Sequence, residues 1–301
     1  MKKVQVLLSS YNGERYIREQ IDSILGQKNV IVELLVRDDG SSDGTRAILA
    51  EYQKNYENIH IVYAENVGVI KSFFLLINQV KEAKYIAFAD QDDVWLPDKL
   101  IRAVTLLEKE EKNIPLVYCS AKQLVDENLN SIPAAITYKN VKTEFGNALV
   151  ENMCTGCTCV INHELLELIQ GRIPHFTVMH DFWIYLVGTC FGKVIYDEQS
   201  YILYRQHGGN ELGVASSIRE NYTRRVKNFR KHRGQLSKQA EELIRIYGAQ
   251  MRKEELETAL FLIRTRQHIK TRIILLQKRK IFRQRKSDDR ILKTLLLFGL
   301  L

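Results

Sequence analysis

The chain has 301 residues, which is room for one or two domains, and its 45% share of hydrophobic residues is typical of a globular protein with a packed core. Its net charge of +8 is unevenly distributed, because residues 219–286 carry 21 Lys and Arg against 6 Glu and the rest of the chain is acidic. The apolar runs are far shorter than the roughly 18–20 residues of a membrane-spanning helix, and five cysteines form no even set. We therefore exclude a spanning helix and a disulfide framework, and expect reduced thiols in the cytoplasm.

Strands and helices alternate through the first hundred residues. Apolar runs rich in β-forming residues predict four strands, at Val4–Ser9, Val30–Val36, Ile59–Ala64 and Tyr85–Ala89. Helical spacing of apolar residues predicts three helices between them, at Arg15–Leu25, Thr45–Tyr56 and Val69–Val80. This order predicts a mostly parallel sheet with helices on both faces. Because ligands of such sheets bind beyond the carboxyl ends of the strands, we expect the four loops that follow these strands to line one crevice.

Residues 101–200 are predicted to complete the same α/β domain. They hold three further predicted strands and one helix, at Leu116–Ala121, Thr158–Ile161, Lys193–Tyr196 and His180–Thr189. After Ser216 the pattern becomes helical, rich in basic residues and free of proline. We therefore expect an α/β domain over residues 1–215 and a basic helical C-terminal region over residues 216–301.

Three carboxylates lie within four residues directly after the fourth predicted strand. Asp90, Asp92 and Asp93 repel one another, which destabilises the turn unless a cation offsets their charge. Such oxygen ligands suit a hard divalent ion, Mg²⁺ or Mn²⁺, which neutralises the charge on a departing diphosphate. The alternative is a structural turn that caps a helix beginning near Asp98, for which one carboxylate would suffice.

A second acidic turn, Asp38-Asp39-Gly40, ends the second predicted strand. The glycine permits a tight turn, and Ser42 or Asp43 can cap the helix that follows, without any function. Neither the tight turn nor the helix cap explains why Asp38 and Asp39 are present. Their oxygens could accept hydrogen bonds from the imide of a pyrimidine or from a ribose hydroxyl.

Together these motifs resemble the nucleotide-binding half of the inverting GT-A glycosyltransferases of family 2, over residues 4–100. The motifs that carry the resemblance are Ser9-Ser10-Tyr11-Asn12-Gly13, Asp38-Asp39-Gly40-Ser41-Ser42-Asp43-Gly44-Thr45, Asn66-Val67-Gly68 and Asp90-Gln91-Asp92-Asp93. With Val94-Trp95 added, the last motif is similar to a rhamnosyltransferase-like branch of the family. The resemblance implies a GT-A type sheet and transfer of a sugar, with rhamnose as a candidate, from a TDP- or UDP-sugar to a polysaccharide or a lipid-linked glycan.

The resemblance also implies roles on the donor side. Asp39 would bind the base, Asp92 the metal, and Asp90 would lie near the ribose or the metal. The residues expected to bind the nucleotide sugar are Ser10, Tyr11, Asn12, Asp38, Asp39, Asn66, Asp90, Gln91, Asp92 and Arg205.

An inverting transferase needs a general base opposite the leaving group. The family supplies it from an acidic residue at a helix start late in the domain, and Asp181 matches that position. His180, where many members have Glu, is the alternative base. Asp181 could also serve as the N-cap of its helix, and the two roles can coexist. The residues expected on the acceptor side are Thr155, Gly156, Cys157, His180 and Trp95; for the loop around Gly156 a structural turn is an equal alternative.

A segment after a further predicted strand, Tyr201–Tyr204, is expected to fold over the donor diphosphate, as in related enzymes. Arg205 could pair with phosphate, and His207 could be a metal ligand or a phosphate donor. Gly208 and Gly209 would permit the motion of a lid, although a surface turn explains them equally well.

The basic C-terminal region mixes Lys and Arg with apolar residues at helical spacing, such as Ile269, Ile273 and Ile274. This pattern is typical of attachment to an anionic membrane surface, so we expect a location at the inner face of the plasma membrane. A solvated helix face and an oligomer contact through the C-terminal helices are the alternatives. No nucleic-acid-binding motif is present, so we expect no nucleic acid as partner.

Two other functions share parts of this pattern. A nucleotidyltransferase that makes the sugar nucleotide would carry a basic, glycine-rich loop after the first strand, and residues 10–14 lack one. A protein that binds nucleotide sugars without catalysis would not need both an acidic metal turn and a candidate base. We therefore predict a glycosyltransferase.

Overall fold

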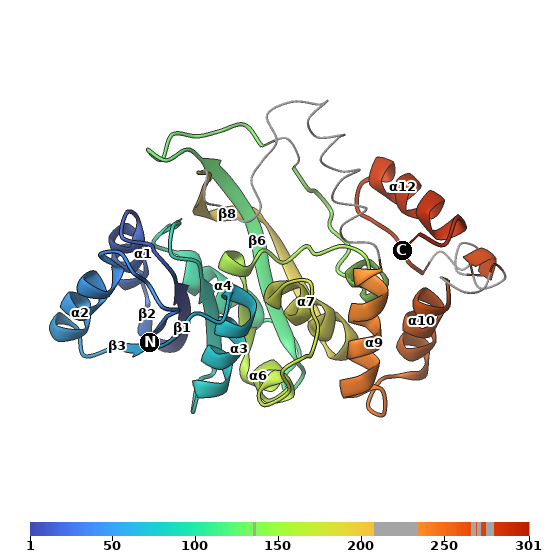
Figure 1. Cartoon of the computed structure of the whole chain (residues 1–301), viewed down its shortest axis with the longest axis horizontal. Helices are drawn as coiled ribbons and strands as arrows, with labels where there is room; N and C mark the ends of the chain where they lie inside the picture. The colour runs from blue at the N-terminus through green and yellow to red at the C-terminus, as the bar shows by residue number, and fades with distance from the viewer. Residues whose placement is uncertain (135–136, 208–233, 266–268, 270–271, 275–279, 301) are drawn as a thin grey trace. The chain divides into compact units, whose positions relative to one another are not determined.

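The computed structural model describes residues 1–134, 137–207, 234–265, 269, 272–274 and 280–300 of the chain (Figure 1). These residues form two compact units. The first comprises Met1–Lys139, Met153–Ile173 and Met179–Arg205, and the second comprises Asn140–Asn152, Pro174–Val178 and Gln206–Leu301. The boundary expected between residues 215 and 216 lies outside the described residues. Two short segments from the first two hundred residues belong to the second unit, which the sequence did not predict.

The first unit is built on one sheet with the strand order β3-β2-β1-β4-β7-β6-β8-β5. Its strands are β1 (Lys2–Ser10), β2 (Val30–Asp38), β3 (Ile59–Tyr63), β4 (Tyr85–Ala89), β5 (Val94–Trp95), β6 (Leu116–Val125), β7 (Val160–Asn162) and β8 (Lys193–Arg205). β1 pairs in parallel with β2 and β4, β2 with β3, and β6 with β8. The other three pairings, β4 with β7, β6 with β7 and β5 with β8, are antiparallel. The prediction of a mostly parallel sheet is confirmed.

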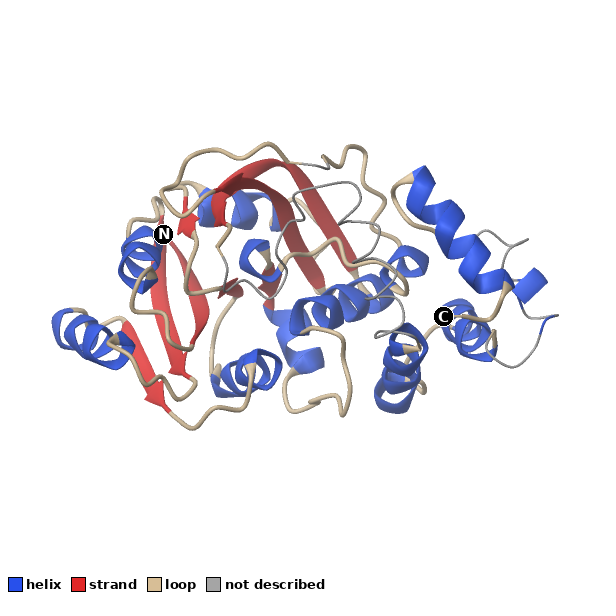
Figure 2. Cartoon of the chain, turned by 45° about the horizontal axis from the view of Figure 1, so that its top comes forward, coloured by secondary structure: helices blue, strands red, loops and turns tan. Residues whose placement is uncertain are grey.

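Helices cover both faces of this sheet, as predicted (Figure 2). They are α1 (Ile17–Leu25), α2 (Thr45–Asn55), α3 (Val69–Gln79), α4 (Lys99–Leu107), α6 (His163–Ile169), α7 (His180–Phe191) and the 3₁₀ helix η1 (Gly156–Thr158). α1, α2 and α4 share a core with Ala87 of β4. Because side chains alternate along a strand, Phe88 points to the opposite face, where Phe73 of α3 packs against it with ring centroids 6.0 Å apart. On α7, a side chain at Gly188 would lie 2.4 Å from Val117 of β6, so this glycine permits close packing.

The structure differs from the predicted elements at three places in the second half of the domain. β8 is one strand where two were predicted, and the two-residue β5 pairs with it, with Val94 opposite Leu203. β7 begins at Val160, because the preceding residues form η1. α7 has Met179 as its N-cap, so the prediction of Asp181 as an N-cap is wrong. Asp181 lies in the first turn of α7 and accepts a hydrogen bond from another segment instead.

The second unit contains the helices α5 (Phe145–Ala148), α9 (Gln235–Tyr247), α10 (Lys253–Arg264) and α12 (Lys286–Leu297). Gln239 of α9 accepts hydrogen bonds from the Thr177 hydroxyl and the Val178 N–H, both at 2.9 Å, which ties residues 174–178 to this unit. The predicted helical patterning is confirmed in α9 and α10; much of the predicted basic stretch lies outside the described residues, and so do Gly208 and Gly209. Of the helices described, none has the length and apolar character needed to cross a membrane.

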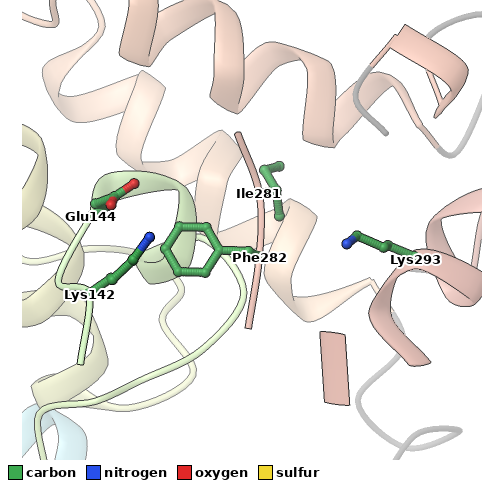
Figure 3. Close-up of a pocket in the computed structure, with 5 residues that line it drawn as sticks. All are labelled: Lys142, Glu144, Ile281, Phe282 and Lys293. Carbon is green, nitrogen blue, oxygen red and sulfur yellow. The ribbon is translucent and has the colours of Figure 1, made fainter. Parts of the chain in front are cut away.

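A cavity of about 260 Å³ lies within the second unit (Figure 3). Its lining residues are Lys142, Glu144, Ile281, Phe282 and Lys293. Figure 3 shows Lys142 and Glu144 on one side of the Phe282 ring and Lys293 on the other. None of the predicted site residues lines this cavity.

Candidate active site

The acidic turn after β4 is hydrogen-bonded to the loop after β1. The Tyr11 N–H donates to Gln91 Oε1 at 2.8 Å, and Gln91 Nε2 donates back to the Tyr11 carbonyl at 3.0 Å. A side chain at Gly13 would lie 2.3 Å from the same Gln91 oxygen, so only glycine leaves room for this pairing. Gln91 therefore fixes the position of the acidic turn relative to the first loop.

The loop after β1 is also joined to the loop after β2. The Asn12 N–H donates to Ser41 Oγ at 2.9 Å, and the Ser42 N–H donates to Asn12 Oδ1 at the same distance. Asn12 has a φ of 49°, a left-handed conformation that asparagine tolerates better than most residues. Thr45, the first residue of α2, accepts a hydrogen bond from the Gly13 N–H at 2.8 Å.

Asp39 connects the loop after β2 to the loop after β3. Its carboxylate accepts hydrogen bonds from the Val67 N–H at 3.0 Å and the Gly68 N–H at 2.9 Å, and it forms a buried ion pair with Arg37. The four loops predicted to line one crevice are thus linked to one another. Asp39 itself is occupied by main-chain partners, and the base contact expected of it stays a prediction. Asn66, beside these partners, is exposed.

Two buried polar atoms at the carboxyl ends of β1 and β2 have no hydrogen-bond partner among the described residues. They are Ser10 Oγ and Asp38 Oδ1, and their residues are directly opposite each other in the β1–β2 register. The other oxygen of Asp38 accepts from Arg46 Nε at 2.7 Å and from the Ser41 N–H at 3.2 Å. A buried polar atom without a partner is costly, so these two atoms favour a ligand that supplies the missing hydrogen bonds.

Arg205, at the end of β8, holds the acidic turn in place. Its Nε donates to the Asp92 carbonyl at 2.8 Å, and its N–H donates to Asp93 Oδ1 at 3.1 Å. The guanidinium is buried, forms an ion pair with Glu19 and lies over the Tyr16 ring. The structure therefore gives Arg205 a positioning role, and the phosphate contact expected of it stays a prediction.

Within the acidic turn the pKa values of Asp90 and Asp93 are raised, as the spacing of the carboxylates predicts. Burial, followed by the charges of Asp93 and Asp92, raises the pKa of Asp90 well above its usual range. Burial, followed by the charge of Asp92, raises the pKa of Asp93 to about 7. Asp98 is the N-cap residue of α4 without a side-chain hydrogen bond. The alternative in which the acidic turn caps this helix is therefore wrong.

A lysine that the sequence analysis missed faces the same cluster. Lys122 of β6 donates to Thr155 Oγ1 at 3.2 Å, and its ammonium lies 4.0 Å from the centroid of the Tyr204 ring. Its positive charge lowers the pKa of Asp90 and of Asp93, against the larger effect of burial. A lone lysine one residue beyond the predicted strand Leu116–Ala121 carries no local signal that could have identified it.

Three side chains of the site present possible metal-ligand atoms close together. The ligand atoms of Asp90, Asp93 and Cys157 all lie within 4.8 Å of one another. Asp93 and Cys157 are fully buried, whereas Asp90 and Asp92 are half-buried. Asp92, the ligand implied by the family resemblance, is not part of this group, and its role stays a prediction.

Asp181 and Gly156 form a second contact beside the cluster. The Gly156 N–H donates to Asp181 Oδ2 at 2.8 Å, and the charge of Asp181 is among those that raise the pKa of Asp90. His180 is 3% exposed and stacks on Phe73 at 3.9 Å, and neither ring nitrogen has a hydrogen-bond partner among the described residues. Burial lowers the pKa of His180 to about 3, so this imidazole is a weak proton acceptor.

Two further expected site residues lie elsewhere. Trp95 is 2% exposed and belongs to the hydrophobic core, where the ammonium of Lys99 lies 3.5 Å from its ring centroid. The structure therefore places no part of the Trp95 ring on a surface that an acceptor could reach. His207 belongs to the second unit, and its expected metal or phosphate contact stays a prediction.

Known proteins resemble this chain in sequence and in fold. Residues 5–169 match the family model described as glycosyl transferase family 2. The chain is 31% identical to the dTDP-rhamnosyl transferase RfbG of Shigella flexneri over 72% of this chain and 77% of that protein. It is 30% identical to WfgD of Escherichia coli, a UDP-Glc:alpha-D-GlcNAc-diphosphoundecaprenol beta-1,3-glucosyltransferase, over 61% and 68% of the two chains. Among solved structures, S. aureus TarS in complex with UDP-GlcNAc aligns with a TM-score of 0.60 at 17% identity, covering 93% of this chain and 85% of that one.

Proposed function

The chain belongs to glycosyl transferase family 2, and from this premise we propose that it is an inverting transferase that moves a sugar from a nucleoside diphosphate to a glycan or lipid-linked saccharide. Its fold is of the GT-A type, like that of TarS. Family membership makes the chain a glycosyltransferase and removes support from the nucleotidyltransferase and non-catalytic alternatives. The match to RfbG favours a dTDP-sugar, with rhamnose as the first candidate.

The nucleoside is proposed to bind where the loops after β1, β2 and β3 meet. Ser10 Oγ and Asp38 Oδ1 are the buried atoms there that lack partners, and a base or a ribose can supply them. Tyr11 is 48% exposed beside them, so its ring is free to lie against the base. This pair of unpartnered atoms beside the anchored acidic turn is the observation that carries the proposal. Asp39 and Asn66 would act from the adjoining loop.

A divalent ion, Mg²⁺ or Mn²⁺, is proposed to be held at the acidic turn. The residues fit such an ion, because Asp93 Oδ2 is buried without an N–H or O–H donor and Asp90 is half-buried beside it. Asp92 is proposed as the ligand next to the solvent. When bound, the ion would neutralise the negative charge that develops on the leaving diphosphate. Arg205 would keep the turn in place, and Lys122 would add a positive charge near it.

Asp181 is proposed as the general base. Its Oδ2 is held by the Gly156 N–H, which fixes the carboxylate in the first turn of α7. It would take the proton from the acceptor hydroxyl as that oxygen attacks the anomeric carbon from the side opposite the diphosphate. The acceptor would lie against Thr155, the half-buried residue of this loop, since Gly156 and Cys157 beside it are buried. The low pKa of His180 argues against the alternative base.

Attachment to an anionic membrane is a further part of the proposal. Ile269 is 61% exposed and Ile273 is 45% exposed, and both lie in the basic segment of the second unit. Exposed apolar residues among cations favour a membrane surface and would bring a lipid-linked acceptor close. We expect the chain to co-sediment with anionic vesicles but not with neutral vesicles. Equal binding to both would refute attachment to an anionic membrane.

The test of the enzymatic proposal is donor turnover across a panel of sugar nucleotides, with and without EDTA. We expect turnover of one nucleoside diphosphate sugar that EDTA abolishes. Asp181→Asn should reduce turnover about 10²-fold or more while donor affinity is kept, because the base acts only in the chemical step. Asp92→Asn should reduce turnover and metal-dependent donor binding together. Full activity in EDTA, or normal turnover by Asp181→Asn, would remove the corresponding assignment.

A further inference from the structure

A sulfur atom lies beside the acidic turn that is proposed to hold the cation. Cys157, in η1, has its Sγ within 4.8 Å of carboxylate oxygens of both Asp90 and Asp93. The thiol is fully buried, and it contacts the carboxylate of Asp93. It therefore faces the acidic turn from inside the protein.

A second observation shows that this group is more than a cluster of acidic residues. Asp93 is completely buried, and its Oδ2 receives no N–H or O–H hydrogen bond from the described residues. Its other oxygen is held by the Arg205 N–H, so the carboxylate cannot turn away without losing that bond. The Cys157 thiol hydrogen-bonds to this carboxylate. A cation bound between the sulfur and the carboxylate would take the place of the thiol proton and would satisfy the buried oxygen that has no N–H or O–H donor.

We propose that Cys157 is a ligand of the divalent cation, together with Asp90 and Asp93, and that its sulfur makes the site favour thiophilic cations such as Co²⁺ and Cd²⁺ over Mg²⁺. The proposal rests on the proposed function, in which the same acidic turn holds the cation that accompanies the donor. It adds a residue from η1 that sets the metal preference. Thiolate ligands select soft and borderline metals, whereas sites made only of oxygen suit Mg²⁺.

The surroundings of the cluster predict a site of moderate affinity. Lys122 and the buried Lys99 both interact electrostatically with Asp93 and Cys157. These two positive charges offset part of the charge of the carboxylates. Asp90 is half-buried, so a cation can enter from its side. Oxygens of a bound diphosphate would then add to the affinity that the protein ligands supply.

The other thiols provide matched controls. Cys154 lies in contact with Cys119 and Cys159, in a separate buried group. Cys190, on α7, is also buried. Neither Cys119 nor Cys190 belongs to the group of Asp90, Asp93 and Cys157.

The experiment titrates the full chain with Cd²⁺ alone and records the sulfur-to-metal charge-transfer absorption in the ultraviolet. The wild-type chain should show one saturable band, and excess Mg²⁺ should displace it only weakly. Cys157→Ser should lose the band, whereas Cys119→Ser and Cys190→Ser should keep it. Asp93→Asn retains all five thiols and serves as a second variant. Its affinity for Cd²⁺, measured from the titration of the band, should be about tenfold lower than that of the wild-type chain.

Two results would overturn the proposal. One is a wild-type chain without the band. The other is a band that survives in folded Cys157→Ser, or an unchanged affinity for Cd²⁺ in Asp93→Asn. The sulfur that binds Cd²⁺ would then belong to the group of Cys119, Cys154 and Cys159. Donor turnover, measured in parallel on the wild-type chain with Mg²⁺ and Mn²⁺, separates the two proposals. Turnover without a sulfur band overturns only the role of Cys157, and a sulfur band without turnover overturns only the proposed function.

Discussion

Replacing Gly156 with alanine tests whether the packing of η1 against α7 positions the proposed base. A Cβ at this residue would lie 2.9 Å from His180 Nε2 and 3.5 Å from Asp181 Cβ. The first distance is shorter than van der Waals contact, so the imidazole has to move by about half an ångström. It has little room, because it is buried and stacks on Phe73 at 3.9 Å. The start of α7, with Asp181, is therefore expected to move instead.

The expected effect on the reaction follows from the size of that movement. Displacing a catalytic group by a fraction of an ångström to 1 Å costs about 10-fold to 100-fold in turnover, and overpacking costs about 1–3 kcal/mol of stability. Gly156→Ala keeps the N–H that donates to Asp181, so loss of that hydrogen bond is not the cause. The assay measures kcat and donor affinity for the single variant, which should lose kcat and keep donor affinity.

The double variant Gly156→Ala/His180→Ala is the control. Removing the imidazole removes the atom that the new Cβ would meet. The double variant should therefore have a higher kcat than the value expected if the separate effects of Gly156→Ala and His180→Ala were independent and combined. Two results would refute the reasoning: a wild-type kcat in Gly156→Ala, or effects of the two substitutions that simply add.

Three further predictions concern other contacts. Burial lowers the pKa of Lys99 from 10.5 to about 8, so the unfolded chain binds more protons between these pH values and stability should rise with pH there. Lys99→Met should thus be about 3 kcal/mol more stable than wild type in urea unfolding at pH 7, and an advantage that persists above pH 10.5 would contradict this. Arg205→Met should destabilise the first unit by about 2–4 kcal/mol, measured by the same unfolding, because it loses its hydrogen bond to the Asp92 carbonyl and its ion pair with Glu19. Gly146→Ala should cost about 3 kcal/mol in thermal unfolding, because its Cβ would lie 1.6 Å from the Lys280 carbonyl; a wild-type melting temperature would show that this packing is wrong.

The elements of the first hundred residues could be predicted from the sequence because their signals are local. Alternating apolar runs and glycine-containing turns placed β1 to β4 and α1 to α3 with their ends within two residues of the structure. The grouping of the four loops also followed, since parallel strands bring their carboxyl ends to one edge of the sheet. Gln91 illustrates the limit of that reasoning. Its motif was recognised, whereas its pairing with the Tyr11 backbone is visible only in the structure.

Only the tertiary structure decided which side chains from distant segments surround the acidic turn. Packing of β6, η1 and α7 beside β4 brings Lys122, Cys157 and Asp181 into electrostatic range of Asp90, and the same packing removes Trp95 from the surface. The same packing places the Asp181 carboxylate against the Gly156 N–H, from which it accepts a hydrogen bond, whereas the sequence predicted Asp181 as a helix cap. Periodicity and turn chemistry describe neighbours along the chain, whereas these contacts depend on how distant segments pack across the sheet. The sequence by itself therefore determined the fold and the family, and the three-dimensional packing decided which side chains lie beside the acidic turn.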